Sequence, residues 1–316
     1  MFKRSFFRNQ SSSLGASILA IAYAGSYLLG LVRDRTLAYY FPTAIKETYD
    51  AAFQVPDLIF NLFAAGILSA AVFLPIFREL VDEKEEEKAY SLASTLMNLI
   101  SIIIIAIGLV CFFTMPALTK LIVPGFDPER QVLVTNLSRI MLLSPLLFGV
   151  SNVIGNILYS FKRFFSYGFA ILLYNGSIIL SIIFLQASLG IYSAAIGLVI
   201  GVLLHLVFRL IELSFTPFKY RFGIQLKSTE FWQLIKLAIP KTLGQITYQG
   251  NLFIFNRIGS LLQAGSISAF SYARNIQSFP VSLFGISLAS AVFPDLSSQA
   301  AGREQTKLSA SLQKSI

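Results

Sequence analysis

Long apolar runs without Asp, Glu, Lys or Arg dominate this sequence, and the longest extends from Phe164 to Phe208. About 20 apolar residues in a helix cross the roughly 30 Å hydrocarbon core of a bilayer. Hydrophobic residues make up 55% of the chain and charged residues only 13%. A soluble globular protein carries about 25% charged residues. The sequence therefore predicts an all-α polytopic membrane protein and disfavours a soluble enzyme or a disordered chain.

The apolar runs predict about eight transmembrane helices. The longest run is too long for one span, and a turn at Gln186–Gly190 is expected to divide it. The first run is too long for a signal peptide, so we expect it to be an uncleaved helix. The expected spans are Leu14–Val32, Leu58–Phe77, Leu92–Met115, Ile140–Phe161, Phe164–Leu185, Ile191–Phe208, Leu234–Leu262 and Ser266–Phe293.

The distribution of loop charges predicts the orientation of these spans. The net charge of +9 could indicate a nucleic-acid partner, but in a membrane protein it more often reflects basic cytoplasmic loops. Lys and Arg concentrate on the side of the N-terminus, in segments such as Lys3–Arg8, Arg78–Lys88 and Lys219–Lys227. We therefore expect both termini to be cytoplasmic, with membrane lipids rather than nucleic acid as the surroundings.

An internal repeat organises the predicted helices. Three residues recur in the same order at a nearly constant separation: Arg33, Tyr49 and Pro56 return as Arg257, Tyr272 and Pro280. Inverted and parallel repeats of this kind are common in transporters. The repeat predicts one complete six-helix lobe and the first two helices of a second, pseudo-symmetric lobe. The expected divisions are a transmembrane lobe at 1–216, a cytoplasmic interfacial linker at 217–236, the two further helices at 237–294 and a polar cytoplasmic tail at 295–316.

Ionisable residues inside the expected spans or next to their ends are the candidate functional residues, because charge within a membrane is costly. The cations are Arg33, Lys241, Arg257 and Arg274, and the acids are Asp50 and Asp57. This surplus of cations would suit an anionic substrate, since arginine binds phosphate through two parallel hydrogen bonds. The alternative is that Arg33 pairs with Asp50 while Arg257 and Arg274 reach the membrane interface.

No pattern for catalysis or for a metal site occurs in the sequence. Cys111 and His205 are the only residues of their types, and each lies in an apolar run. A zinc site needs several such ligands. We therefore expect no metal, no cofactor and no enzymatic activity.

The ordered segments Gly30–Ala38, Tyr49–Phe53, Val55–Leu58 and Leu62–Phe77 resemble the MurJ (MviN) lipid II flippase family, and Ser271–Pro294 looks like the eighth helix of the same family. The family belongs to the multidrug/oligosaccharidyl-lipid/polysaccharide exporter superfamily, and its members have fourteen helices. The resemblance implies that this chain corresponds to the first lobe and two helices of the second. A second chain supplying the missing helices is then a possible partner.

The resemblance and the intramembrane charges together predict a substrate site. Arg33, Asp34 and Asp50 match residues of the family pattern, while Asn61 stands where the family usually has an arginine. In the eighth helix, the family's arginine is displaced by one position to Arg274, followed by Asn275. With Arg257, these residues form the expected substrate-binding set, in which Asp50 would orient or release the arginines.

The resemblance implies a flippase of the bacterial plasma (inner) membrane. It would move a polyprenyl-pyrophosphate-linked peptidoglycan precursor, an anionic lipid II-like molecule, from the cytoplasmic to the outer leaflet by alternating access, driven by the membrane potential or by an ion. Two alternatives remain open at this point. One is a drug or polysaccharide exporter on the same fold, and the other is a truncated membrane scaffold that transports nothing.

Overall fold

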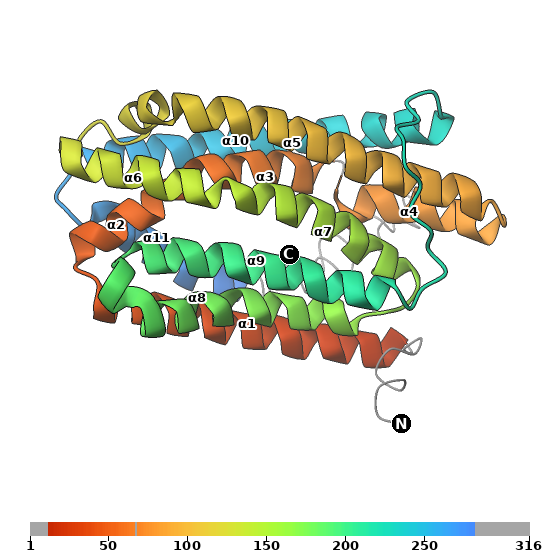
Figure 1. Cartoon of the computed structure of the whole chain (residues 1–316), viewed down its shortest axis with the longest axis horizontal. Coiled ribbons are helices and arrows are strands. Elements are labelled where there is room, and N and C mark those ends of the chain that lie inside the picture. Colours follow the sequence, from red (N-terminus) through yellow and green to blue (C-terminus); the bar gives the residue numbers. More distant parts are fainter. Residues whose placement is uncertain (1–11, 67, 282–316) are drawn as a thin grey trace, which may run out of the picture. The chain divides into compact units, whose positions relative to one another are not determined.

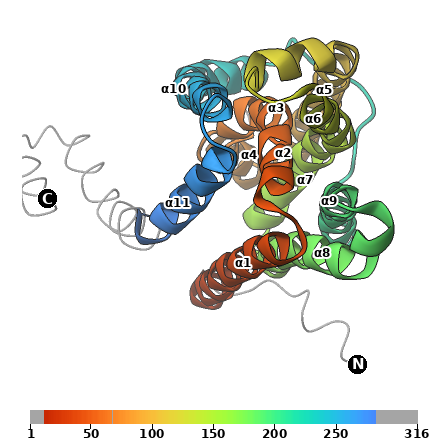
Figure 2. The ribbon, with the colours of Figure 1, turned by 90° about the vertical axis from the view of Figure 1, so that its left-hand side faces the viewer.

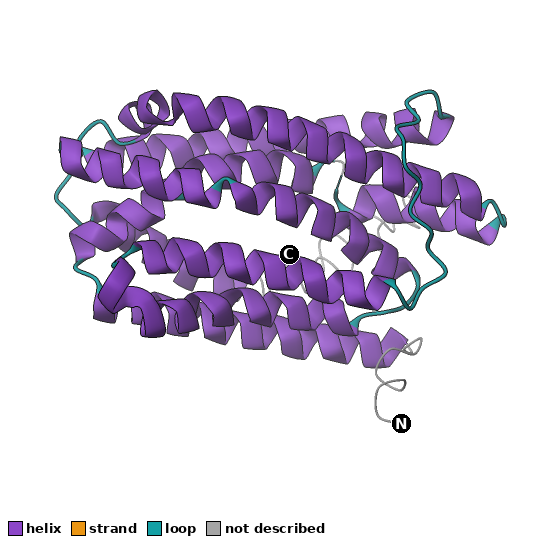
Figure 3. Ribbon diagram, in the orientation of Figure 1, coloured by secondary structure: helices purple, strands orange, loops and turns teal. Residues whose placement is uncertain are grey.

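The computed structural model describes residues 12–66 and 68–281, and all regular secondary structure in this part is helical (Figure 3). The chain divides into two compact units, Met1–Ser268 and Ala269–Ile316. Helix α11 runs from the first unit into the second. Each unit is described by itself. The expected continuation of the eighth span to Phe293 and the tail at 295–316 lie outside the described residues.

The helices follow one another with short connections. They are α1 (Ser12–Tyr40), α2 (Thr43–Ala52), α3 (Gln54–Ala65), α4 (Ala70–Asp82), α5 (Glu86–Ile122), α6 (Pro128–Met141), α7 (Leu143–Ser160), α8 (Phe165–Leu189), α9 (Tyr192–Leu213), α10 (Thr229–Ser260) and α11 (Ser266–Pro280). Four stretches are long and apolar enough to cross a membrane: Glu86–Ile122, Pro128–Ser160, Gly168–Leu189 and Tyr192–Leu213. The predicted all-α polytopic membrane fold is confirmed.

The first unit is an up-and-down bundle with two opposite loop ends (Figure 1). One end carries the connections at residues 41–42, 123–127, 190–191 and 261–265, and we call it the α2 end. The other carries the connections at 83–85, 161–164 and 214–228, and we call it the linker end. In Figure 2, which shows the α2 end face on, α8 lies between α1 and α9.

The second expected span, Leu58–Phe77, is divided between two helices, α3 and α4, so its prediction as one helix was wrong, and α2 precedes them. Helicity begins already at Thr43, and the chain breaks at Phe53 and again between Ala65 and Ala70. At the second break α10 comes very close, because a Cβ on Gly66 would stand 2.1 Å from the Thr242 hydroxyl. The absence of a side chain at Gly66 leaves room there for the Thr242 side chain.

Prolines inside the helices leave backbone carbonyls without their usual partner four residues later. Pro56 frees the carbonyl of Ala52, which accepts a hydrogen bond of 3.0 Å from the Ser138 hydroxyl. Pro116 frees the carbonyl of Phe112, which accepts one of 3.0 Å from Arg139 Nε. Backbone groups in a membrane must find partners within the protein, so these side chains make the prolines tolerable.

Small residues set the close packing of α8 against α9. Gly190, with φ +53°, forms the predicted turn between them. A Cβ on Gly201 would stand 2.8 Å from the carbonyl of Tyr174, and one on Gly197 would stand 2.9 Å from Ile178 Cα. Small residues at helix crossings allow such backbone contact in membrane proteins. The division of the long apolar run at Gln186–Gly190 is therefore confirmed.

A fully buried arginine crosses the interior between α7 and α9. Arg209, 2% exposed, donates a 2.7 Å hydrogen bond from Nη1 to the carbonyl of Ser151. A Cβ on Gly155 would stand 2.5 Å from the same Nη1. The absence of a side chain at Gly155 thus provides the space that the guanidinium occupies.

Replacing Gly155 with Val is expected to destabilise the protein by about 1–3 kcal/mol, because the added methyl groups overpack a filled interior. Thermal unfolding of the detergent-solubilised protein, followed by intrinsic fluorescence, measures the loss. Gly176→Val is the matched control, since nothing lies within 4 Å of a Cβ on that helical glycine. Equal melting temperatures for the two variants would contradict the packing role of Gly155.

The connection between α9 and α10 differs in part from the predicted linker at 217–236. Thr229–Lys236 are the start of α10, because Ser228 caps that helix by accepting a hydrogen bond from the Phe231 amide. The preceding segment is fastened along α5: Asn98 donates to the Gly223 carbonyl and accepts from the Tyr220 hydroxyl. Phe222 is 96% exposed beside these contacts. Its placement against anionic lipid stays a prediction.

Candidate functional site

Helix α2 carries three charged residues into the interior at the α2 end of the bundle. Lys46 and Glu47 are 2% and 1% exposed. Lys46 Nζ lies 2.6 Å from Asp50 Oδ2, one helical turn away. Buried charges are tolerated only when they are paired and hydrogen-bonded. Packing alone does not explain why α2 buries charged side chains, so these residues are candidates for a functional role.

Glu47 holds the turn that begins α11. Its Oε2 accepts hydrogen bonds from Arg130 Nη2 at 2.6 Å and from the Gly265 amide at 3.0 Å. Its Oε1 accepts one of 2.8 Å from the Ile267 amide. Ser266 and Ile267 are the first residues of α11. A carboxylate at a helix N-terminus satisfies free amides and interacts favourably with the helix dipole.

Asp50 completes these contacts. Its Oδ2 accepts a 2.8 Å hydrogen bond from the Ser268 hydroxyl in addition to the Lys46 contact. We name Lys46, Glu47 and Asp50, with their partners Gly265, Ile267 and Ser268, the α2 latch. The expectation that Asp50 orients or pairs with an arginine differs from this arrangement, because the partners found for Asp50 are Lys46 and Ser268.

A second polar group lies on α1, facing α8. Arg33 donates from Nε and Nη2 to Asp34 Oδ1, at 3.2 and 2.9 Å. Its Nη1 donates to Asn175 Oδ1 at 3.1 Å, and Asn175 Nδ2 donates to the Ser26 hydroxyl at 3.2 Å. The alternative pairing of Arg33 with Asp50 is therefore not observed. The Arg33 side chain remains 21% exposed, so a ligand can still reach it.

Within the first unit, neither Asn61 nor Arg257 is hydrogen-bonded to Arg33. Arg257 is exposed on α10 and donates a 2.6 Å hydrogen bond from Nη1 to the carbonyl of Leu121, near the end of α5. Asn61 donates to the carbonyl of Asp57 within its own helix. Arg274 and Asn275 belong to the second compact unit. A substrate-binding role for these four residues stays a prediction.

Reasoning from the sequence missed Lys46, Glu47 and Asn175. Lys46 precedes the apolar run of the second span, which starts only at Leu58, so the hydropathy pattern indicates a loop at this position. The i, i+4 spacing of Lys46 and Asp50 was the available sign of a helix there. Asn175 sits in a run with no charge, and its sequence surroundings give no indication that Arg33 lies opposite.

No group of three or more His, Cys, Asp or Glu side chains placed to hold a metal ion occurs within residues 12–66 and 68–281. His205 is buried in the bundle, with Nδ1 at 2.8 Å from the Ser151 hydroxyl and its ring against Phe148. This residue packs inside the bundle.

The family model described as "Lipid II flippase MurJ" matches residues 37–316. The chain belongs to the MurJ family. It is 31% identical over 286 residues to the probable lipid II flippase MurJ of Rickettsia prowazekii, covering 89% of this chain and 55% of that protein. The corresponding protein of Buchnera aphidicola from Acyrthosiphon pisum is 29% identical over 282 residues, which cover 86% of this chain and 54% of that protein.

Solved structures agree with this membership of the MurJ family. A lipid II flippase MurJ in an inward closed conformation superposes with a TM-score of 0.71 and 26% identity, covering 90% of this chain and 59% of that one. An inward-facing multidrug resistance MATE family transporter gives 0.73 at 16% identity, covering 92% and 66%, and shares the fold alone. The chain spans about half the length of the curated relatives it matches.

Proposed function

We propose that this MurJ-family protein takes part in moving a polyprenyl-pyrophosphate-linked peptidoglycan precursor across the bacterial plasma (inner) membrane. The observation that carries the proposal is the Arg33–Asp34–Asn175 group, a partly exposed guanidinium held inside an apolar bundle. A guanidinium in such surroundings suits the oxygens of a pyrophosphate. The relatives' names, which describe probable lipid II flippases, supply the substrate class.

The two ends of the bundle suit opposite sides of the membrane. Basic residues at the linker end favour the cytoplasm for that end, with both chain termini on the same side. The α2 end then faces outwards, where the α2 latch holds the α10–α11 turn. The described arrangement would be the cytoplasm-facing state of an alternating-access cycle, and release of the α2 latch would accompany opening to the outside.

The membrane potential can drive such a step without a nucleotide. A pyrophosphate carries about two negative charges, and each is worth about 2.3 kcal/mol per 100 mV. Movement of an anion towards the positive outer side thus gains roughly 4–5 kcal/mol at 100 mV. We propose transport rather than catalysis as the activity, with the lipid-linked precursor and membrane lipids as partners. A second chain could supply the helices beyond those described.

Reconstitution into liposomes tests the proposal. The purified protein, alone or with a co-purifying second chain, is given a fluorescent polyprenyl-pyrophosphate disaccharide whose exposure is read with a membrane-impermeant quencher. We expect faster outward movement when the cytoplasmic side is negative than when it is positive. Movement no faster than in protein-free liposomes would contradict the proposal. Transport of a cationic drug instead would favour an exporter of the multidrug class.

A further inference from the structure

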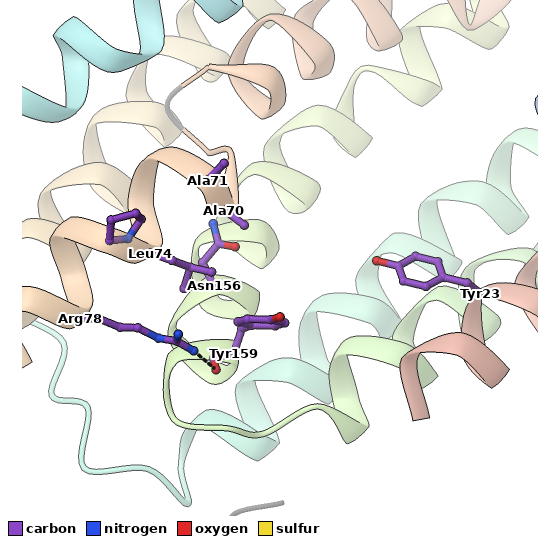
Figure 4. A pocket seen from close by; sticks show the side chains of 8 residues that line it. Tyr23, Ala70, Ala71, Leu74, Arg78, Asn156 and Tyr159 are labelled. Carbon is purple, nitrogen blue, oxygen red and sulfur yellow. Dashed lines mark hydrogen bonds between the residues drawn. The ribbon is translucent and has the colours of Figure 1, made fainter. Parts of the chain in front are cut away.

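A cavity of about 480 Å³ opens between α1, α4 and α7 towards the linker end (Figure 4). Residues that line it include Tyr23, Ala71, Pro75, Arg78, Asn156 and Tyr159. This volume lies within the range of small-molecule sites, which combine an apolar lining with a few polar groups. Arg78 is the one charged residue among the described residues that line it.

Two hydrogen-bond acceptors belong to residues that line this cavity. Asn156 is 4% exposed and donates a 2.9 Å hydrogen bond from Nδ2 to the carbonyl of Leu68. That bond fixes the amide orientation, and the amide oxygen points into the open space opposite Tyr23 (Figure 4). The structure gives this oxygen no hydrogen-bond donor from the described residues.

The second acceptor is the carbonyl of Ala71. Pro75, four residues later in α4, has no N–H to donate to it. The carbonyls freed by Pro56 and Pro116 accept hydrogen bonds from Ser138 and Arg139. For Ala71 no side-chain donor occurs among the described residues. This carbonyl can therefore accept a hydrogen bond from a ligand.

Donors and aromatic rings complete the lining. Arg78 lies with its guanidinium 5.7 Å from the centre of the Tyr159 ring and donates from Nη2 to the Tyr159 carbonyl at 3.3 Å. Guanidinium has five N–H groups, so others can reach a ligand. The Tyr23 and Tyr159 hydroxyls point towards each other across the cavity (Figure 4).

The polar groups that line this cavity suit a ligand with hydroxyl groups better than one with a phosphate. Two carbonyl oxygens would repel an anion, and one cation does not offset a pyrophosphate. Hydroxyl groups, in contrast, can donate to both carbonyls and accept from Arg78, and amide N–H groups can donate to the carbonyls. The tyrosine rings offer apolar faces to a sugar. We propose that this cavity binds the saccharide portion of the lipid-linked substrate.

The position of the cavity fits a substrate anchored at Arg33. Tyr23 and Arg33 lie on the same helix, ten residues apart, which corresponds to roughly 15 Å. The pyrophosphate at Arg33 and a disaccharide at the cavity would then occupy adjacent sites along α1. This assignment rests on the proposed function, because only a lipid-linked saccharide would join the two sites.

Two ligands distinguish the sites: a short-chain prenyl pyrophosphate, and the same molecule carrying the disaccharide chitobiose. Their dissociation constants are measured with the purified protein and with Tyr23→Ala and Arg78→Gln, which alter exposed side chains. Tyr39→Ala, at an 81% exposed tyrosine of the same helix, is the control. We expect the saccharide to strengthen binding at least tenfold, and both variants to lose most of this gain while their affinity for the bare pyrophosphate is unchanged.

An undiminished saccharide gain in both variants would overturn the cavity assignment and leave the proposed function standing. If the wild-type protein binds neither lipid, the proposed function is contradicted. The cavity is then tested by itself with free chitobiose as the ligand. Binding of chitobiose that Tyr23→Ala weakens would still support the cavity as a saccharide site. Failure of the wild-type protein to bind chitobiose in that case would overturn the assignment.

Discussion

Replacing Glu47 with Ala is expected to release the start of α11 and open the α2 end of the bundle. The substitution removes the acceptor of the Arg130 guanidinium and of the Gly265 and Ile267 amides. Removing one partner of a buried ion pair costs about 3–5 kcal/mol. Since about 1.4 kcal/mol corresponds to a factor of ten, opening should become at least a hundredfold more frequent.

Cysteine labelling measures this opening. Ile267 is 3% exposed and contacts Glu47 through its backbone, so Ile267→Cys keeps the α2 latch intact, and Cys111→Ser removes the native thiol. A membrane-impermeant maleimide added from the outside should label position 267 slowly in the parent and about a hundredfold faster with Glu47→Ala. Glu83→Ala, at an exposed residue of the linker end, is the control. Equal labelling rates would show that Glu47 does not hold this end closed.

The helical architecture could be predicted from the sequence, because a long apolar run indicates a helix that lies in lipid. The turn at Gly190 and the paired helices α8 and α9 follow from a charge-free run that is too long for one span. The position of Arg33 and Asp34 at the end of the first apolar run could also be read from the sequence, but their mutual hydrogen bonds were not predicted. These features depend on short stretches of chain and on the cost of charge in a membrane.

The α2 latch could not be predicted in the same way. Glu47 contacts Gly265 and Ile267, which are more than two hundred residues further along the chain. A hydropathy pattern carries no information about such pairs. The charges of α2 resemble those of a solvated loop, and only the fold shows that Lys46 and Glu47 are buried.

The expectation that Arg33 and Arg257 belong to one substrate site could not be secured from the sequence either. The repeat placed both residues at matching positions, but matching positions do not fix the neighbours of a side chain. Arg257, on α10, donates a hydrogen bond to the carbonyl of Leu121 on α5. Arg33, in contrast, donates one to Asn175 on α8. The proposed pyrophosphate site therefore depends on Arg33 and its immediate partners.

Replacing Arg33 with Ala is expected to weaken binding of a prenyl pyrophosphate by about ten- to a hundredfold. Hydrogen bonds between charged groups contribute roughly 1.5–3 kcal/mol, and the guanidinium offers two such bonds to a phosphate. Arg33→Lys should retain part of the affinity, because it keeps the charge but loses the planar pair of donors. Arg35→Ala is the matched control, as Arg35 is an exposed residue of the same helix two positions away.

Titration of the purified, lipid-reconstituted protein with a short-chain prenyl pyrophosphate is the most direct measurement of whether Arg33 forms the anion site. Calorimetry would give the dissociation constants of the wild type, Arg33→Ala and Arg35→Ala under one salt condition. We expect Arg35→Ala to bind as the wild type does and Arg33→Ala to bind at least tenfold more weakly, with the same helical content by circular dichroism. Identical affinities for all three proteins would contradict the assignment of Arg33 to the substrate pyrophosphate.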